Sequence, residues 1–196
     1  MAKPKSSSRS LLKNLLQNPL QIGTVKESSK ALSRMMIKQI PKDADYIVEF
    51  GAGTAPITEE IAKKFSPEKI FSFELNKELY QKARVRVPHV RFYNCNVIEA
   101  PEILPTEVVG HVDTVISSLP LVNLSADTNR EILQSAFKIL KPNGVFVQFT
   151  YLPFLPPIQV HKELGLWSQF EGVEWWNLPP AYVWIFRRID SGQKAP

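Results

Sequence analysis

Two glycines follow the first apolar segment of the chain, and they form the first candidate for a ligand site. Gly51 and Gly53 come directly after residues 46–50, and residues 54–65 then carry apolar side chains at helical spacing. A strand, a glycine turn and a helix in this order form the nucleotide-like sites of doubly wound sheets. Because glycine has no Cβ, its backbone can turn sharply and a ligand can lie directly against it. Pro56 stands where the full dinucleotide fingerprint has a third glycine, and Gly-x-Gly also occurs in ordinary turns.

An acid at the end of the next apolar segment strengthens the ligand interpretation. Residues 69–73 read as a second buried strand, and Glu74 follows them about 20 residues after the glycines, where doubly wound folds place the acid that binds ribose hydroxyls. The alternative is a surface acid that caps the following helix, a role that Asn76 could fill equally well. The position at the carboxyl end of the strand favours the ribose interpretation.

The composition excludes several classes of protein. The 196 residues fit one α/β domain with a short extension, and 44% hydrophobic residues are enough for a sizeable core. The single cysteine, Cys95, cannot form a disulfide within the chain. His89, His111 and His161 are scattered and offer no metal-ligand spacing, so we expect no metal site.

The charge of the chain points to an anionic partner. A formal net charge of +5 favours either nucleic acid or an anionic membrane surface. No apolar run approaches the ~20 residues that a membrane-spanning helix needs. The first residues are basic but lack a cleavable signal pattern, so we expect a protein that stays in the cytoplasm.

The N-terminal segment is a candidate for membrane docking. Residues 9–17, from Arg9 to Gln17, carry four leucines on one helical face, with four basic residues around them. Such a basic amphipathic helix can lie in a membrane interface, and each basic residue contributes ~1 kcal/mol on an anionic leaflet. A short helix packed on the protein's own core is the alternative. We therefore divide the chain into a docking segment, 1–20, and a domain, 21–196.

The order of the remaining elements predicts a doubly wound sheet. Strands are expected at 46–50, 69–73, 89–93, 112–117 and 145–150, helices at 28–39, 54–65 and 127–140, and a final hairpin at 171–176 and 182–188. Alternating strands and helices are typical of a parallel sheet. The fold class we expect is α/β and Rossmann-like, with a mostly parallel seven-stranded sheet, an antiparallel last strand and preceding N-terminal helices.

A parallel sheet that ends in such a hairpin resembles the class I fold of methyltransferases that use S-adenosylmethionine. The resemblance implies S-adenosylmethionine as cofactor, held by Glu49, Gly51, Ala52, Gly53, Thr54, Glu74, Leu75, Asn96 and Val97. Many members of that superfamily have an acid where this chain has Asn96, but an amide oxygen can also accept a hydrogen bond from the adenine amino group.

The chain resembles the bacterial phospholipid N-methyltransferases more closely. The stretches that carry this resemblance are Asn18-Pro-Leu-Gln-Ile-Gly23, Ser118-Leu-Pro-Leu-Val-Asn123, Gly144-Val-Phe-Val-Gln-Phe-Thr-Tyr151 and Asn177-Leu-Pro-Pro-Ala-Tyr-Val183. The family tends to have proline where Glu27 stands. The resemblance implies transfer of methyl groups to the headgroup amine of phosphatidylethanolamine, toward phosphatidylcholine. It also implies a peripheral enzyme that docks on the cytoplasmic face of the inner membrane through its first helix.

The expected chemistry is the attack of a neutral amine on a sulfonium methyl group. Ser117, Ser118 and Leu119 lie at the carboxyl end of the fourth strand, where carbonyls or hydroxyls could orient the amine. Aromatic faces attract methylated ammonium groups by ~1–2 kcal/mol each, and the candidates are Tyr151, Trp176 and Tyr182. If Trp175 and Trp176 lie in a strand, they point to opposite faces. No residue emerges as a general base.

Three other functions fit parts of the sequence. A nucleic-acid adenine N6-methyltransferase fits the positive charge and the Ser-Ser-Leu-Pro loop, but those enzymes resemble one another in an aromatic residue after the proline, where this chain has Leu121. A non-catalytic binding protein is opposed by the intact glycines and Glu74. A small-molecule methyltransferase would have no use for the basic, leucine-rich N-terminus.

Overall fold

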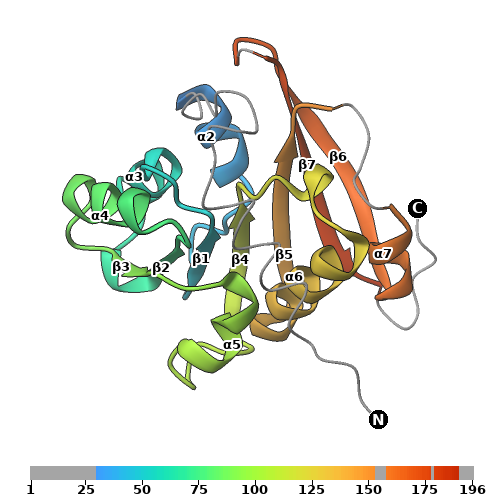
Figure 1. Ribbon diagram of the computed structural model, residues 1–196, viewed down its shortest axis with the longest axis horizontal. Coiled ribbons are helices and arrows are strands. Elements are labelled where there is room, and N and C mark those ends of the chain that lie inside the picture. The colour runs from blue at the N-terminus through green and yellow to red at the C-terminus, as the bar shows by residue number, and fades with distance from the viewer. Residues whose placement is uncertain (1–29, 153–157, 178, 190–196) are drawn as a thin grey trace.

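The computed structural model describes residues 30–152, 158–177 and 179–189 (Figure 1). The predicted docking helix at 9–17 lies outside the described residues, as do residues 28 and 29 of the predicted helix at 28–39. The described part of the chain contains no helix that is both long enough and apolar enough to cross a membrane.

The core of the protein is one seven-stranded sheet with the order β3-β2-β1-β4-β5-β7-β6. The strands are β1 (Ile47–Phe50), β2 (Ile70–Phe73), β3 (Arg91–Tyr93), β4 (Val112–Ser117), β5 (Leu140–Thr150), β6 (Leu166–Glu174) and β7 (Ala181–Arg188). Strands β1 to β5 pair in parallel, and β7 runs antiparallel to both β5 and β6. The predicted fold class, with its antiparallel last strand, is confirmed.

Helices cover both faces of this sheet (Figure 1). They are α2 (Lys30–Ile37), α3 (Pro56–Ala62), α4 (Lys77–Arg86), α5 (Ala100–Ile103), α6 (Ala126–Ile139) and α7 (Ile158–Glu163), with short 3₁₀ turns η2 (Pro67–Lys69), η3 (Val97–Glu99) and η4 (Leu121–Asn123). One apolar core joins α2, α3 and α4 to the sheet, and the other joins α5, α6 and α7 to the opposite face. Strands β1, β2 and β4 are buried along their whole length, as their near-continuous apolar sequences require.

Two strand boundaries differ from the sequence prediction. β5 begins at Leu140 rather than at 145. The Lys-Pro-Asn-Gly segment comes just after the end of α6, and it already belongs to the strand. Gly144 is required there, since a Cβ would lie 2.9 Å from the Val112 carbonyl oxygen. β6 runs over 166–174 rather than 171–176, with a bulge between Phe170 and Gly172. The interpretation of Trp175 and Trp176 as alternating strand residues is therefore wrong.

Candidate active site

The glycine loop after β1 is fixed to the end of the neighbouring strand β2. The backbone N–H groups of Gly51 and Ala52 both donate to the Phe73 carbonyl, at 2.9 and 3.0 Å. Gly51 and Gly53 have φ values of 82° and 57°, in the left-handed region that glycine tolerates. Ala55 also has a positive φ, 65°, at the N-cap of α3, and a strained non-glycine residue of this kind is common at ligand sites.

The two glycines differ in what surrounds them. A Cβ on Gly51 would meet the Leu119 Cδ2 atom at 3.0 Å, whereas a Cβ on Gly53 would meet nothing within 4 Å. Gly51 therefore lies close to the loop after β4, and its φ of 82° favours glycine there as well. Gly53 borders open space, and it is the position at which a ligand could lie directly against the backbone.

Glu74 contacts the glycine loop directly. Its Oε2 atom accepts a hydrogen bond from the Gly53 N–H at 2.8 Å, and its Oε1 atom accepts one from the Asn76 N–H at 2.8 Å. Burial raises the pKa of the Glu74 carboxyl, while these backbone bonds act to lower it. The alternative role considered for Glu74 was to cap the following helix. Asn76 fills that role, since its side chain accepts hydrogen bonds from N–H groups in the first turn of α4. The Leu75 N–H is a third backbone donor to the Glu74 carboxylate. An ionised carboxylate offers about four acceptor positions, so capacity remains for a ribose hydroxyl.

Glu49 lies beneath the glycine loop and is completely buried. Its Oε2 atom accepts hydrogen bonds from the hydroxyls of Thr58 and Ser72, and its Oε1 atom has no hydrogen-bond partner among the described residues. Burial raises the pKa of Glu49 to about 7, against the two hydroxyl hydrogen bonds, which lower it. A cationic group nearby, such as the amino end of the expected cofactor, would favour the ionised form of this carboxyl.

The loop after β3 is attached to the loop after β2 by an asparagine that the sequence analysis did not single out. The Asn94 Nδ2 atom donates to the carbonyls of Glu74 and Leu75, at 2.8 and 3.0 Å. The Asn96 Oδ1 atom accepts from the Ile98 N–H at 3.1 Å and keeps a second lone pair for an adenine amino group. Position directly after a strand end was the signal that could have identified Asn94.

Val97 belongs to the core rather than to the surface of this site. Its side chain is 5% exposed, and its carbonyl accepts a hydrogen bond from the Ser135 hydroxyl at 2.6 Å. Ala52 is likewise buried, whereas Thr54 and Leu75 are half-buried beside Gly53 and Glu74. These residues can take part in binding through their backbone or their exposed atoms only.

The predicted cofactor fits the residues that are present. The loops after β1, β2 and β3 provide a bare backbone at Gly53, a fixed carboxylate at Glu74 and an amide acceptor at Asn96, and β1 itself provides the buried carboxyl of Glu49. S-adenosylmethionine carries a cationic amino end, ribose hydroxyls and an adenine amino group that match these features in kind. These four residues would hold it.

The loop 117–120 after β4 is held by Gln148, a second residue that the sequence analysis missed. The Gln148 Nε2 atom donates to the Leu119 carbonyl at 3.0 Å, and its buried Oε1 atom has no hydrogen-bond partner in the described chain. The Ser118 N–H donates to the Phe50 carbonyl, and the buried Ser117 hydroxyl accepts from the Leu119 N–H. The side chain of Leu119 is buried in the core, so its contribution to a substrate site is its backbone.

The aromatic candidates do not form one cage. Thr150 pairs with Tyr182, so strand alternation sends Tyr151 and Tyr182 to opposite faces of the sheet. Tyr151 packs against Phe149 and shares a side-chain hydrogen bond with Asn177, and burial raises the pKa of its hydroxyl. Tyr182 packs against Phe170. The two tyrosines therefore lie on different sides of the sheet near the end of β5.

Trp176 lies in the turn after β6 and is 92% exposed. The interpretation that it lines a substrate pocket is therefore wrong.

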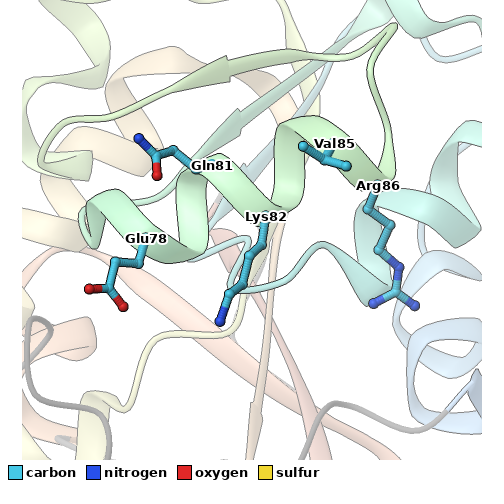
Figure 2. A pocket seen from close by; sticks show the side chains of 5 residues that line it. All are labelled: Glu78, Gln81, Lys82, Val85 and Arg86. Atoms are coloured by element: carbon cyan, nitrogen blue, oxygen red, sulfur yellow. The ribbon is translucent and has the colours of Figure 1, made fainter.

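The other candidate groups lie away from this edge of the sheet. His89 and His111 precede β3 and β4, at the edge opposite the glycine loop. Within the described residues, no three His, Cys, Asp or Glu side chains are grouped so that they could hold a metal ion. Figure 2 shows the five side chains of α4 that line a hollow. The volume of this hollow is about 490 Å³. One of the five side chains, that of Arg86, donates to the Thr54 carbonyl and thereby ties the helix to the glycine loop.

Comparisons with known proteins agree with this geometry. A family model described as a methyltransferase domain matches residues 47–144. The chain is 29% identical over 139 residues to an ornithine lipid N-methyltransferase of Singulisphaera acidiphila, which covers 68% of this chain and 72% of that protein. It is 27% identical over 148 residues to a ribosomal RNA small subunit methyltransferase A of Caldanaerobacter subterraneus, covering 70% of this chain and about half, 53%, of the relative.

Solved structures share the fold. A Burkholderia thailandensis 1,6-didemethyltoxoflavin-N1-methyltransferase with bound S-adenosylhomocysteine gives a TM-score of 0.68 at 15% identity, covering 97% of this chain and 94% of that one. A precorrin-6y C5,15-methyltransferase of Geobacter metallireducens gives 0.67 at 15% identity, covering 85% and 93%. At this level of identity the likeness concerns the fold alone.

Proposed function

Because the chain belongs to the methyltransferase domain family and is an S-adenosylmethionine-dependent methyltransferase, we propose that it methylates the headgroup amine of an aminolipid. The substrate we propose is phosphatidylethanolamine, with its methylated forms leading toward phosphatidylcholine. The observation that carries the proposal is the similarity to an ornithine lipid N-methyltransferase over 72% of that protein. Both lipids present an amine at a membrane surface, so ornithine lipids are the competing substrate.

The cofactor, when bound, supplies an electrophilic methyl group on a sulfonium. Gly53 provides the bare backbone beside it, and Glu74 provides acceptors for its ribose. Gln148 fixes the position of the Leu119 carbonyl, which lies in the loop that we assign to the amine. Positioning of this kind accounts for a large share of the acceleration in reactions between two bound groups.

The amine must lose a proton before it reacts. A buried site disfavours the charged ammonium, so transfer of the headgroup from water into a dry pocket lowers the amine pKa. Neither His89 nor His111 lies at the edge of the sheet where Glu74 and Ser118 are found. Desolvation, rather than either of these histidines, is therefore the source of the neutral amine in this proposal.

We further propose that residues 1–20 dock the enzyme on the anionic cytoplasmic face of the inner membrane, with 21–196 as the catalytic domain. Basic residues and leucines alternate in 9–17 with the spacing of an interfacial helix. Such a contact would bring the headgroup layer to the domain without a spanning segment.

A nucleic-acid adenine N6-methyltransferase is the second candidate, favoured by the ribosomal RNA methyltransferase relative and the net charge of +5. The residue that follows the Ser-Ser-Leu-Pro loop opposes it. Leu121 is 3% exposed and its carbonyl accepts a hydrogen bond from the Asn129 side chain, so it cannot stack on a flipped base.

Methyl transfer from labelled S-adenosylmethionine separates these candidates. The full chain would be incubated with vesicles that contain phosphatidylethanolamine, with vesicles that contain ornithine lipid, or with unmethylated ribosomal RNA. We expect label in phosphatidylethanolamine. Label in ornithine lipid alone would replace the substrate within the same class, and label in RNA alone would overturn the lipid function.

A further inference from the structure

Two adjacent tryptophans are exposed at the tip of the β6–β7 hairpin. Trp176 is 92% exposed, the largest value among the large hydrophobic residues of the described chain, and Trp175 is 69% exposed. Both follow Glu174, the last residue of β6, and precede Ala181, the first residue of β7. Adjacent indoles in water are an unusual surface for a protein without a partner, because contiguous exposed apolar groups mark interaction sites.

The tip lies at the edge of the sheet that carries the candidate active site. Glu174 pairs with Ala181 and Thr150 pairs with Tyr182, so the turn extends past the end of β5. β5 is parallel to β4 and β1, whose ends carry the loops of Ser118 and Gly51. Figure 1 shows the hairpin projecting beyond the other elements at this edge. A surface that meets the two indoles therefore also faces the site.

Hydrogen bonds shape the turn that carries the two tryptophans. The backbone N–H of Trp176 donates to the Glu174 carboxylate at 3.1 Å, and the buried Asn177 side chain donates to the Pro179 carbonyl at 2.8 Å. Asn177 also bonds the side chain of Tyr151 at the end of β5. The exposure of Trp175 and Trp176 is thus built into the fold.

We propose that Trp175 and Trp176 form an interfacial anchor that inserts into the headgroup region of a lipid bilayer and places the active-site edge against it. This inference rests on the proposed lipid function, and it names a membrane contact separate from residues 1–20. Trp is the residue type that prefers the membrane–water interface, because its ring is apolar and its N–H is polar.

The size and charge of the tip favour a bilayer over a protein. Two indoles offer at most about 500 Å² at ~250 Å² each, whereas a stable protein interface needs about 800 Å² on each partner. No Lys or Arg occurs between Lys162 and Arg187, and the nearest charged residues along the chain are the acids Glu171 and Glu174. Binding through the tip is therefore driven by partition of the rings, and salt leaves it intact.

The test compares the double variant Trp175→Ala/Trp176→Ala with Trp167→Ala in the full chain. Trp167 lies on the same hairpin at its other end, paired with Arg187, and so serves as the matched control. Binding to phosphatidylcholine–phosphatidylethanolamine vesicles is measured by sedimentation in 0.5 M NaCl, which screens the basic N-terminus. Quenching of tryptophan emission by brominated lipid reports insertion. Circular dichroism checks that each variant is folded.

We expect the double variant to bind vesicles at least 10-fold more weakly and to lose most of the quenching, while Trp167→Ala keeps both. Unchanged binding and quenching in the double variant would overturn the anchor. The anchor would also be overturned if sedimentation velocity showed a dimer for wild type and for Trp167→Ala but a monomer for the double variant. The tip would then be an interface between two copies of the chain.

Methyl transfer to a short-chain phosphatidylethanolamine below its micellar concentration separates the anchor from the proposed function. We expect the double variant to methylate this soluble substrate at the wild-type rate and the vesicle substrate at least 10-fold more slowly. No transfer by wild type to either lipid, with quenching by brominated lipid intact, would refute the lipid function and leave the anchor standing.

Discussion

Substituting Glu49 by Gln should remove a pH dependence from the stability of the protein. Glu49 is fully buried, and burial raises the pKa of its carboxyl from 4.5 to about 7. Between these two pH values the folded chain keeps a proton that the unfolded chain releases. The free energy of unfolding therefore falls as the pH rises through this window, and the loss is complete above pH 7. At 1.36 kcal/mol per pH unit, the full loss is about 3 kcal/mol.

The Gln side chain has the same size and no charge to desolvate. Relative to wild type, Glu49→Gln should gain about 2–3 kcal/mol between pH 5 and pH 8, because only the wild type pays for ionisation in that range. Reorientation of the Thr58 and Ser72 hydroxyls adds an offset of about 1 kcal/mol that does not change with pH. The slope with pH, rather than the stability at one pH, is thus the diagnostic quantity.

Urea unfolding followed by circular dichroism at pH 5, 6, 7 and 8 gives this slope. The control is Glu59→Gln, the same chemical change on a carboxylate whose pKa is lowered, chiefly by a hydrogen bond from Arg86. A group with a lowered pKa loses its contribution only below its unfolded pKa, so this control should parallel wild type from pH 5 to 8. Parallel profiles for wild type and Glu49→Gln would show that the carboxyl is ionised throughout, and the reasoning would fail.

Four further outcomes are expected. Gly53→Val should lose cofactor affinity by more than 10-fold in calorimetry, because the side chain enters the open space beside the backbone and the φ of 57° strains a β-branched residue; normal affinity would misplace the site. Cys95, whose thiol pKa burial raises to about 11, should react with iodoacetamide at pH 8 about 100-fold more slowly in the folded than in the urea-unfolded chain, and equal rates would contradict this. Gln148→Met should lower kcat while cofactor affinity stays within about 2-fold, since the amide holds the Leu119 carbonyl; an unchanged kcat would remove Gln148 from the site. Deleting residues 1–16 should remove the salt-sensitive part of the sedimentation with anionic vesicles, and unchanged sedimentation at low salt would exclude the docking helix.

The sequence predicted the sheet because its strands have distinctive patterns. The apolar runs that became β1, β2 and β4 are buried on both faces, which only a parallel sheet between two helical layers explains. The start of β5 could not be predicted, because Pro142 and Gly144 are typical of a turn, and they lie in an irregular stretch between Leu140 and Val145, which pair with β4. The extent of β6 was missed for a similar reason, since its first residues become a strand by pairing with the end of β7.

The sequence predicted those parts of the candidate site in which the spacing of particular residue types indicates a ligand. The spacing from Gly53 to Glu74 predicted two residues that the fold brings into a direct hydrogen bond. The sequence could not separate the two glycines, because the reason for Gly51 is a side chain 68 positions later, Leu119. Asn94 and Gln148 escaped notice because an isolated amide has no pattern until its partners lie on neighbouring loops.

The hydrogen bonds that shape the site join loops of different strands in a continuous series. The β1 loop is bonded to the end of β2, Glu74 is bonded to Gly53, Asn94 is bonded to the Glu74 carbonyl, and Gln148 is bonded to the loop after β4. Each loop is therefore positioned in part by a neighbouring strand of the sheet. A ligand that bridges Gly53 and Asn96 would close this series, and the stability that it adds should appear in both loops at once.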